Sequence, residues 1–184
     1  MTPFLLVLSS PSGGGKTTIA RPLLQARPDV GYSVSATTRP PRPGEGDGHD
    51  YHFLTGAEFE RRVVAGEFLE HATYGGHRYG TLRAEIDRVL GNGCHAVLDI
   101  EVEGARQVMD RMPDAVRVFV LPPSAKVLVE RLRSRDTETP ATRRVRLARA
   151  AEELLAVTEY DYVVVNEHLR DAVDAVGAIL DAES

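Results

Sequence analysis

Nine residues near the start of the sequence have the types and the spacing that bind a polyphosphate: Ser-Pro-Ser-Gly-Gly-Gly-Lys-Thr-Thr at positions 10–18. An apolar run at residues 4–8 precedes them, and a helical pattern begins at Lys16. A glycine-rich turn between a strand and a helix directs backbone N–H groups and the positive end of the helix toward one point. A phosphate group is therefore the expected ligand of this segment.

The segment matches the P-loop pattern G-x-x-x-x-G-K-[ST] except at its first position, where Ser10 replaces a glycine. In this pattern the lysine, here Lys16, reaches the outer phosphates, and the hydroxyl of the next residue, here Thr17, ligates Mg2+. An ordinary flexible turn is the alternative, and the position of Gly-Lys-Thr at a strand-to-helix junction argues against it. Pro22 lies farther along the predicted helix and is expected to bend it. The predicted phosphate-binding residues are Ser12, Gly13, Gly14, Gly15, Lys16, Thr17 and Thr18.

The composition indicates one domain that binds neither nucleic acid nor membranes. The chain has 184 residues, which is enough for a single domain with a substantial core. A formal net charge of −5 argues against general nucleic-acid binding, which needs a broad basic surface. Cys94 is the only cysteine, so no intrachain disulfide can form. The apolar run at residues 4–8 is too short for a signal peptide or a membrane span, so we expect a cytoplasmic protein.

The hydrophobic pattern predicts an α/β fold with a parallel sheet flanked by helices. Short apolar runs without alternation are typical of strands buried on both faces, and they occur at residues 4–8, 96–100, 116–121 and 162–165. Helical patterns lie at residues 16–27, 124–133 and 172–180. This order of elements favours right-handed crossovers between parallel strands.

Two insertions interrupt the alternation of strands and helices. Residues 31–93 contain closely spaced proline and glycine turn signals, which predict a small lobe of mixed structure. Residues 137–151 are rich in arginine, and Thr139 is suited to cap a helix whose first residue is Pro140.

Several charged residues are expected to face solvent and to have no role in the site. Arg131, Arg133, Arg144 and Arg149 are interpreted as a solvated helical surface. Five histidines, including His95, are expected on the surface or in loops, because none has the spacing of a metal site.

The first insertion contains residues suited to a second phosphate site. Arg39 and Arg42 could both bind one phosphate, with Tyr51 and Tyr79 adding phenolic donors. A solvated, proline-rich loop is the alternative for this segment. Its position after a P-loop favours a site for an acceptor nucleotide.

The sequence resembles the guanylate kinase family over nearly its whole length. The resemblance is carried in order by the P-loop, the Ser-Val-Ser-x-Thr-Thr-Arg run from Ser33, Glu-Phe-Leu-Glu ending at Glu70, Tyr-Gly-Thr ending at Thr81, Leu-Asp-Ile-Glu ending at Glu101, Arg135 with Thr-Glu-Thr, and Val-Asn ending at Asn166. The family implies a P-loop core at residues 1–31, 94–134 and 155–184. It also implies a GMP-binding lobe at about 32–93 and a short helical lid at about 135–154.

The resemblance implies roles for individual residues. Lys16, Arg39, Arg135 and Arg146 would be catalytic, Asn166 would lie near the adenine of ATP, and Thr17 would ligate Mg2+ together with phosphates and water. The GMP site would contain Ser35, Arg39, Arg42, Glu45, Tyr51, Glu70, Tyr79, Thr81, Asp99 and Glu101. Glu70 can accept from both the N1–H and the 2-amino group of guanine, and adenine would leave it unpaired. A solvated acid is the alternative for Glu70, and a helix cap is the alternative for Asp99 and Glu101.

The activity that the resemblance implies is transfer of the γ-phosphoryl group of Mg-ATP to GMP. It indicates no preferred monovalent cation or oligomeric state. Two other functions are compatible with the sequence. One is a P-loop kinase of a non-guanine acceptor such as ribose 1,5-bisphosphate, which would not need Ser35, Glu70 and Thr81 together. The other is a non-catalytic interaction module that binds GMP, although such modules commonly have an eroded P-loop.

Overall fold

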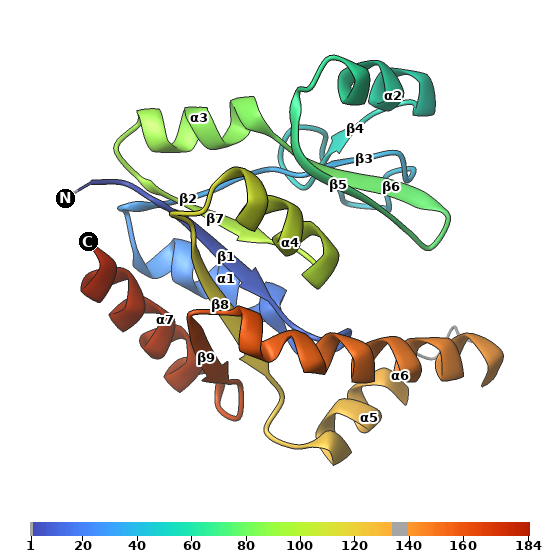
Figure 1. The fold of residues 1–184 in the computed structure, drawn as a ribbon, viewed down its shortest axis with the longest axis vertical. Coiled ribbons are helices and arrows are strands. Elements are labelled where there is room, and N and C mark those ends of the chain that lie inside the picture. Colours follow the sequence, from blue (N-terminus) through green and yellow to red (C-terminus); the bar gives the residue numbers. More distant parts are fainter. Residues whose placement is uncertain (1, 134–139) are drawn as a thin grey trace.

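The computed structural model describes residues 2–133 and 140–184, and for residues 140–143 and 146 it describes the backbone alone. In this part of the chain a five-stranded parallel sheet forms the core, with the order β2-β7-β1-β8-β9 (Figure 1). The strands are β1 (Leu5–Ser9), β2 (Val30–Tyr32), β7 (His95–Asp99), β8 (Val116–Leu121) and β9 (Tyr162–Val165). The predicted fold class, a parallel α/β sheet flanked by helices, is confirmed.

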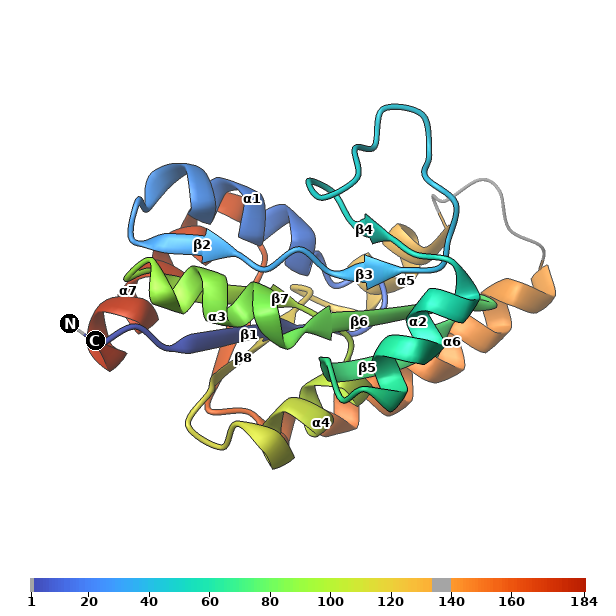
Figure 2. The same ribbon diagram turned by 90° about the horizontal axis from the view of Figure 1, so that it is seen from above.

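Helices cover both faces of the core sheet, as Figures 1 and 2 show. Leu6 and Leu8 pack with α1 (Lys16–Ala26) and α7 (Leu169–Glu183). Their neighbours Leu5 and Val7 point to the other face, into the cluster formed with α3 (Arg83–Gly91) and α4 (Val102–Arg111). Because successive strand residues point to opposite faces, an unbroken apolar run is what a sheet buried on both sides requires.

A smaller mixed sheet forms the body of the first insertion, with the order β4-β3-β6-β5. Its elements are β3 (Ala36–Thr37), β4 (His52–Phe53), α2 (Gly56–Val64), β5 (Phe68–Tyr74) and β6 (His77–Leu82). Phe59 of α2 stacks on Phe68 of β5, with ring centroids 4.4 Å apart. Gly75 and Gly76 form the turn between β5 and β6 with φ values of 57° and 80°, as a tight hairpin with two positive-φ residues requires.

The second insertion lies against the carboxyl side of the core. Its described residues belong to α6 (Pro140–Leu155), which follows α5 (Ala125–Arg133) and is followed by a 3-10 turn, η1 (Ala156–Glu159). The described part of α6 begins at Pro140. Thr139 lies outside the described residues, so the predicted cap and first helical residue stay predictions. Figures 1 and 2 show both chain ends at one end of the molecule and the small sheet and α6 toward the other.

Several local expectations change in the structure. The strand β2 and the helix α3 were not predicted, and α3 contributes Ile86 and Val89 to the core. The helix α1 runs from Lys16 to Ala26 with Pro22 inside it, and the bend expected at Pro22 stays a prediction. The expectation for His95 was wrong, because His95 is 1% exposed on β7. Within the described residues no helix has the length and apolar character needed to cross a membrane.

Candidate active site

The predicted phosphate-binding loop joins β1 to α1. Gly13 and Gly15 have φ values of 85° and 95°, a conformation that only glycine adopts at low cost. Gly14 is needed for a different reason, because a Cβ there would lie 2.6 Å from the Cβ of Ser10. The side chain of Ser10 is buried, and its hydroxyl donates to the carbonyl of Pro11 at 3.0 Å. Ser10 therefore fits the loop because Gly14 leaves room for it.

Lys16 lies at the first turn of α1 and is paired with two carboxylates from the end of β7. Its Nζ donates to Glu101 Oε1 at 2.7 Å and lies 3.6 Å from Asp99 Oδ1. Burial alone would lower the pKa of Lys16, but Asp99 and Glu101 raise it above its usual value. Among the described residues Asp99 Oδ1 has no hydrogen-bond partner although it is buried. The structure thus brings together three of the predicted site residues at the carboxyl edge of the sheet, where ligands bind in open α/β folds.

Arg39 and Arg42 are held by one carboxylate, that of Glu45. Arg39 Nη2 donates to Glu45 Oε1 at 2.8 Å, and the backbone N–H of Arg42 donates to Glu45 Oε2 at 2.7 Å. The hydrogen bond from Arg39 lowers the pKa of Glu45. The side chain of Arg42 is exposed. The loop therefore presents its two arginines from a fixed turn.

Tyr51 and Tyr79 lie beside Arg39. Their ring centroids are 6.1 Å apart, and the guanidinium of Arg39 lies 5.3 Å from the centroid of Tyr51. Burial, followed by the neighbouring Tyr79 and Asp99, raises the pKa of Tyr51. Asp99 at the end of β7 is thus part of the electrostatic surroundings of Tyr51.

Glu70 and Thr81 meet across the β5–β6 pair. The Thr81 hydroxyl donates to Glu70 Oε1 at 2.7 Å, and Glu70 is 4% exposed. Burial raises the pKa of Glu70 to about 7, against the hydrogen bonds from Thr81 that lower it. The alternative for Glu70, a solvated acid, is therefore excluded, and its role in binding guanine stays a prediction. Ser35 is half-buried just before β3, and its carbonyl accepts from the N–H of His52 at 2.9 Å.

Arg131 contacts the phosphate-binding loop, so its interpretation as a solvated residue was wrong. Its Nη1 donates to the carbonyl of Gly14 at 3.3 Å and its Nη2 to the carbonyl of Asn166 at 3.5 Å. Asn166 is buried and lies so near Gly15 that a Cβ on Gly15 would be 2.6 Å from Asn166 Nδ2. Thus Arg131 and Asn166 pack on the loop from two different elements.

A chain of contacts connects the loop with α6 and with the β5–β6 hairpin. The backbone N–H of Ser12 donates to Glu153 Oε2 at 2.8 Å, and Arg149 Nε donates to Glu153 Oε1 at 2.9 Å. The guanidinium of Arg149 lies 4.9 Å from the ring centroid of Tyr74. Arg149 therefore belongs to the surroundings of the site, not to a solvated surface. Glu153 was not identified in the sequence.

Replacing Glu153 with glutamine is expected to lower the free energy of unfolding by about 1–3 kcal/mol. Glutamine keeps an oxygen for the N–H of Ser12 but removes the charge that pairs with the half-buried Arg149. Urea denaturation measures the change. Glu159→Gln is the matched control, because Glu159 forms a more exposed pair with Arg106, and its cost should stay below about 1 kcal/mol. An equally small decrease in the free energy of unfolding for both variants would show that Glu153 stabilises the protein no more than the exposed Glu159 does.

Two predicted catalytic arginines cannot be placed at the site. Arg135 lies outside the described residues. Arg146 is part of α6, and its side chain lies outside the described part of the chain. Both remain predictions.

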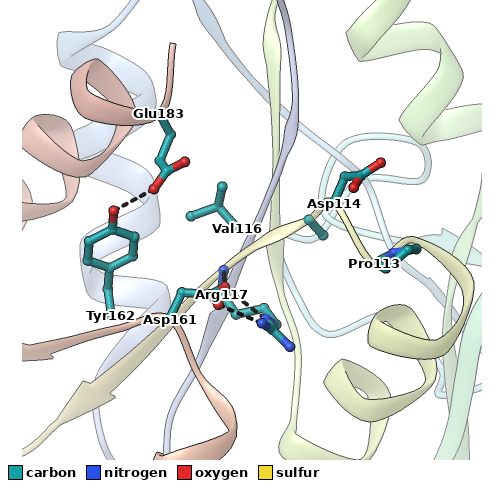
Figure 3. Close-up of a pocket in the computed structure, with 8 residues that line it drawn as sticks. Pro113, Asp114, Val116, Arg117, Asp161, Tyr162 and Glu183 are labelled. Carbon is teal, nitrogen blue, oxygen red and sulfur yellow. Dashed lines mark hydrogen bonds and ion pairs between the residues drawn. The ribbon is translucent and has the colours of Figure 1, made fainter.

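A surface hollow lies at the opposite end of the core sheet, where β8 and β9 begin (Figure 3). Its charged groups are largely satisfied by one another, since Arg117 pairs with Asp161 and the hydroxyl of Tyr162 donates to Glu183. It is lined by Pro113, Asp114, Ala115, Val116, Arg117, Asp161, Tyr162 and Glu183. Because open α/β sheets bind ligands at the carboxyl ends of their strands, the P-loop edge is the better candidate for the site.

Comparison with known proteins agrees with this geometry. The guanylate kinase family model matches residues 3–183. A guanylate kinase of Sphingopyxis alaskensis is 49% identical over 97% of this chain and 82% of its own length. One of Gloeobacter violaceus is 51% identical over 96% of this chain and 86% of its own length. The crystal structure of guanylate kinase from Anaplasma phagocytophilum superposes with a TM-score of 0.80 at 38% identity and covers 99% of this chain and 86% of that one. The chain belongs to the guanylate kinase family.

Proposed function

We propose that this protein transfers the γ-phosphoryl group of ATP to GMP, giving ADP and GDP, and that it also accepts dGMP. The observation that carries this proposal is the buried Glu70 carboxylate bonded to Thr81. A P-loop is common to many phosphotransferases, whereas a buried carboxylate in the acceptor lobe is suited to the N–H groups of guanine. The relatives named above are guanylate kinases, which supports the same acceptor.

The ATP side of the reaction would use the P-loop, from Ser12 to Thr18, with Asn166 near the adenine. Lys16 would bind the β- and γ-phosphates in exchange for part of its contact with Glu101. Arg131, which already contacts Gly14, would add positive charge beside the same phosphates.

Kinases of this family generally use Mg-ATP. No group of three or more acidic, histidine or cysteine side chains suited to a metal occurs among the described residues. A magnesium ion held mainly by phosphates and water needs only one or two protein ligands. The hydroxyl of the exposed Thr17 and the buried Oδ1 of Asp99, which has no hydrogen-bond partner among the described residues, fit that requirement. When bound, Mg2+ would neutralise charge on the transferring phosphates.

The GMP side would use the lobe at about residues 32–93. Arg39, Arg42, Tyr51 and Tyr79 would bind the GMP phosphate, with Glu45 fixing the two arginines. Ser35, Glu70 and Thr81 would bind the guanine base. Asp99 and Glu101 would lie between the two nucleotides, next to Lys16.

Transfer itself would need no general base, because a GMP phosphate oxygen is already an anionic nucleophile at neutral pH. The protein would align the two nucleotides and neutralise charge as a loose transition state forms. We assign Arg135 and Arg146, from a lid at about residues 135–154, to the transferring group. Closure of the lid and the lobe on the core, at about residues 1–31, 94–134 and 155–184, would exclude water as a competing acceptor. A cytoplasmic location suits a chain with a single cysteine.

The acceptor should be identified by measuring ADP formation from Mg-ATP with GMP, dGMP, IMP, AMP, UMP and ribose 1,5-bisphosphate in separate reactions. We expect turnover with GMP and dGMP, and poor turnover with IMP because IMP lacks the 2-amino group that Glu70 would bind. Activity restricted to a non-guanine acceptor would retain the P-loop assignment and reject the guanine site. A folded sample that binds GMP but transfers no phosphate would instead favour the interaction module.

A further inference from the structure

One face of α4 contacts the strand that carries Glu70. Gly104, Gln107 and Arg111 lie on this face, because residues three, four and seven apart share one side of a helix. Gln107 and Arg111 bind the backbone of β5 on either side of Glu70, and Gly104 lies against the Glu70 carboxylate itself. A second face of α4 belongs to the core, where Ala105 and Val108 are buried, and Glu103, Arg106 and Asp110 are exposed. The proposed guanine reader is thus attached to a helix of the core, across the boundary of the lobe.

Gln107 and Arg111 fix the strand. Gln107 Oε1 accepts from the N–H of His71 at 3.2 Å, and Gln107 Nε2 donates to the carbonyl of His71 at 2.9 Å. Arg111 donates to the carbonyl of Leu69. Because β5 is an edge strand of the small sheet, these side chains take the place of a further strand. Both backbone neighbours of Glu70 are therefore held by α4.

Gly104 leaves the space that the carboxylate fills. A Cβ at this position would lie 2.6 Å from Glu70 Oε2 and 3.1 Å from Glu70 Cδ. Glu70 cannot simply turn away, because Thr81 binds its other oxygen at 2.7 Å and the side chain is 4% exposed. The backbone of Gly104 is helical, so its conformation does not require glycine, and alanine would favour the helix. The absence of a side chain matters here for the carboxylate alone.

We propose that Gly104 is a specificity-determining residue. Because it has no side chain, the Glu70 carboxylate can occupy the position from which it binds guanine. This inference rests on the proposed function, in which Glu70 binds guanine. A methyl group at residue 104 displaces the carboxylate from the edge of the base while leaving the P-loop untouched. The consequence is selective, since GMP binding suffers and ATP binding does not.

Gly104→Ala tests this with Gly177→Ala as a matched control. Gly177 lies in the helix α7, and a Cβ there would meet no atom within 4 Å. For Gly104→Ala we expect the KM for GMP to rise at least roughly tenfold, which is about 1.4 kcal/mol, and the preference for GMP over IMP to fall by a similar factor. The KM for ATP should remain within about twofold, and the melting temperature within about 3 °C of the wild type. Gly177→Ala should leave both kinetic constants unchanged.

A double-mutant cycle shows whether Gly104 acts through Glu70. In a Glu70→Gln background, Gly104→Ala should change the KM for GMP by less than about twofold, because the effect of residues that act together is not additive. Full additivity would overturn the inference, and so would a Gly104→Ala variant with the wild-type preference for GMP over IMP.

The same measurements separate this inference from the proposed function. If Glu70→Gln reduces the preference for GMP and Gly104→Ala does not, the inference about Gly104 fails and Glu70 remains the guanine reader. If Glu70→Gln itself leaves the preference unchanged, the guanine site of the proposed function fails. Should Gly104→Ala not fold, Gln107→Met removes both bonds to His71 at similar volume. It should raise the KM for GMP at least about fivefold, since each of the two lost hydrogen bonds has a net contribution of about that size, and an equal rise for ATP would overturn the inference.

Discussion

Lys16→Met should lower kcat/KM for phosphoryl transfer at least about a thousandfold, or roughly 4 kcal/mol of transition-state stabilisation. The reason is the position of the ammonium group. Lys16 extends from the first turn of α1 and is held between Asp99 and Glu101 at the carboxyl edge of the sheet. Methionine preserves the length of the side chain and removes the charge that would neutralise the β- and γ-phosphates. Steady-state kinetics with GMP and Mg-ATP measures the loss.

The matched control is Lys126→Met, because Lys126 is the other lysine of the chain and is exposed on α5. This variant should keep wild-type activity. Lys16→Met also leaves the buried Asp99 without its cation. Removing one partner of a buried ion pair lowers the free energy of unfolding by about 3–5 kcal/mol. Circular dichroism must therefore show a folded sample at the assay temperature. A folded Lys16→Met protein with the wild-type rate would remove Lys16 from the phosphate site.

Four strands of the core sheet, β1, β7, β8 and β9, could be predicted from the sequence, because each is a continuous apolar run of the kind that a strand buried on both faces requires. The edge strand β2 could not. It has three residues, and its pairing with β7 depends on residues about sixty positions away, such as His95 opposite Val30. Gly31 was interpreted as the start of a turn-rich segment, yet a Cβ there would lie 2.5 Å from a methyl group of Val89 in α3. Tertiary packing explains why residue 31 is a glycine, and the local sequence pattern carries no information about that packing.

The candidate site shows the same division between local and distant information. The loop from Ser12 to Thr18 could be recognised because its function depends on consecutive residues. The contacts of Arg131 with Gly14 and of Glu153 with Ser12 join residues 117 and 141 positions apart, and surface arginines on a helix are far commoner than buried ones. One signal for Glu153 was available. It lies beside the stripe formed by Leu147, Ala150 and Leu154, and an acid on the apolar face of a helix needs a partner.

Glu70 should make the binding of GMP depend on pH. Burial raises the pKa of Glu70 to about 7 in the protein without ligand. Only the ionised carboxylate accepts from both N–H groups of guanine, so below pH 7 binding must first release a proton. The Glu70 contribution to GMP affinity should therefore fall roughly tenfold per pH unit between pH 7 and 5. Isothermal titration with GMP over this range measures it.

Glu70→Gln provides the control for this titration. The GMP phosphate also titrates, near pH 6, but it does so equally in both proteins, so the difference between them isolates the carboxylate. At pH 8 Glu70→Gln should lower the affinity for GMP at least about a hundredfold. The amide group of glutamine places an N–H opposite one of the N–H groups of guanine, so that hydrogen bond is lost. Parallel pH curves for wild type and variant would show that Glu70 does not bind guanine through its ionised form.

The stability of the free protein should change with pH in the opposite sense. The folded protein holds the Glu70 proton more tightly than the unfolded chain, whose usual value is 4.5. The stabilisation that this provides is complete below about pH 4.5 and is lost as the pH rises to about 7. Glu70→Gln has no such loss, so its stability relative to wild type should increase over that interval. In this proposal the Glu70 carboxylate would destabilise the free protein in the pH range where it binds GMP best, which is the cost expected of a buried group that recognises a ligand. Gly104 would leave the space that the carboxylate needs.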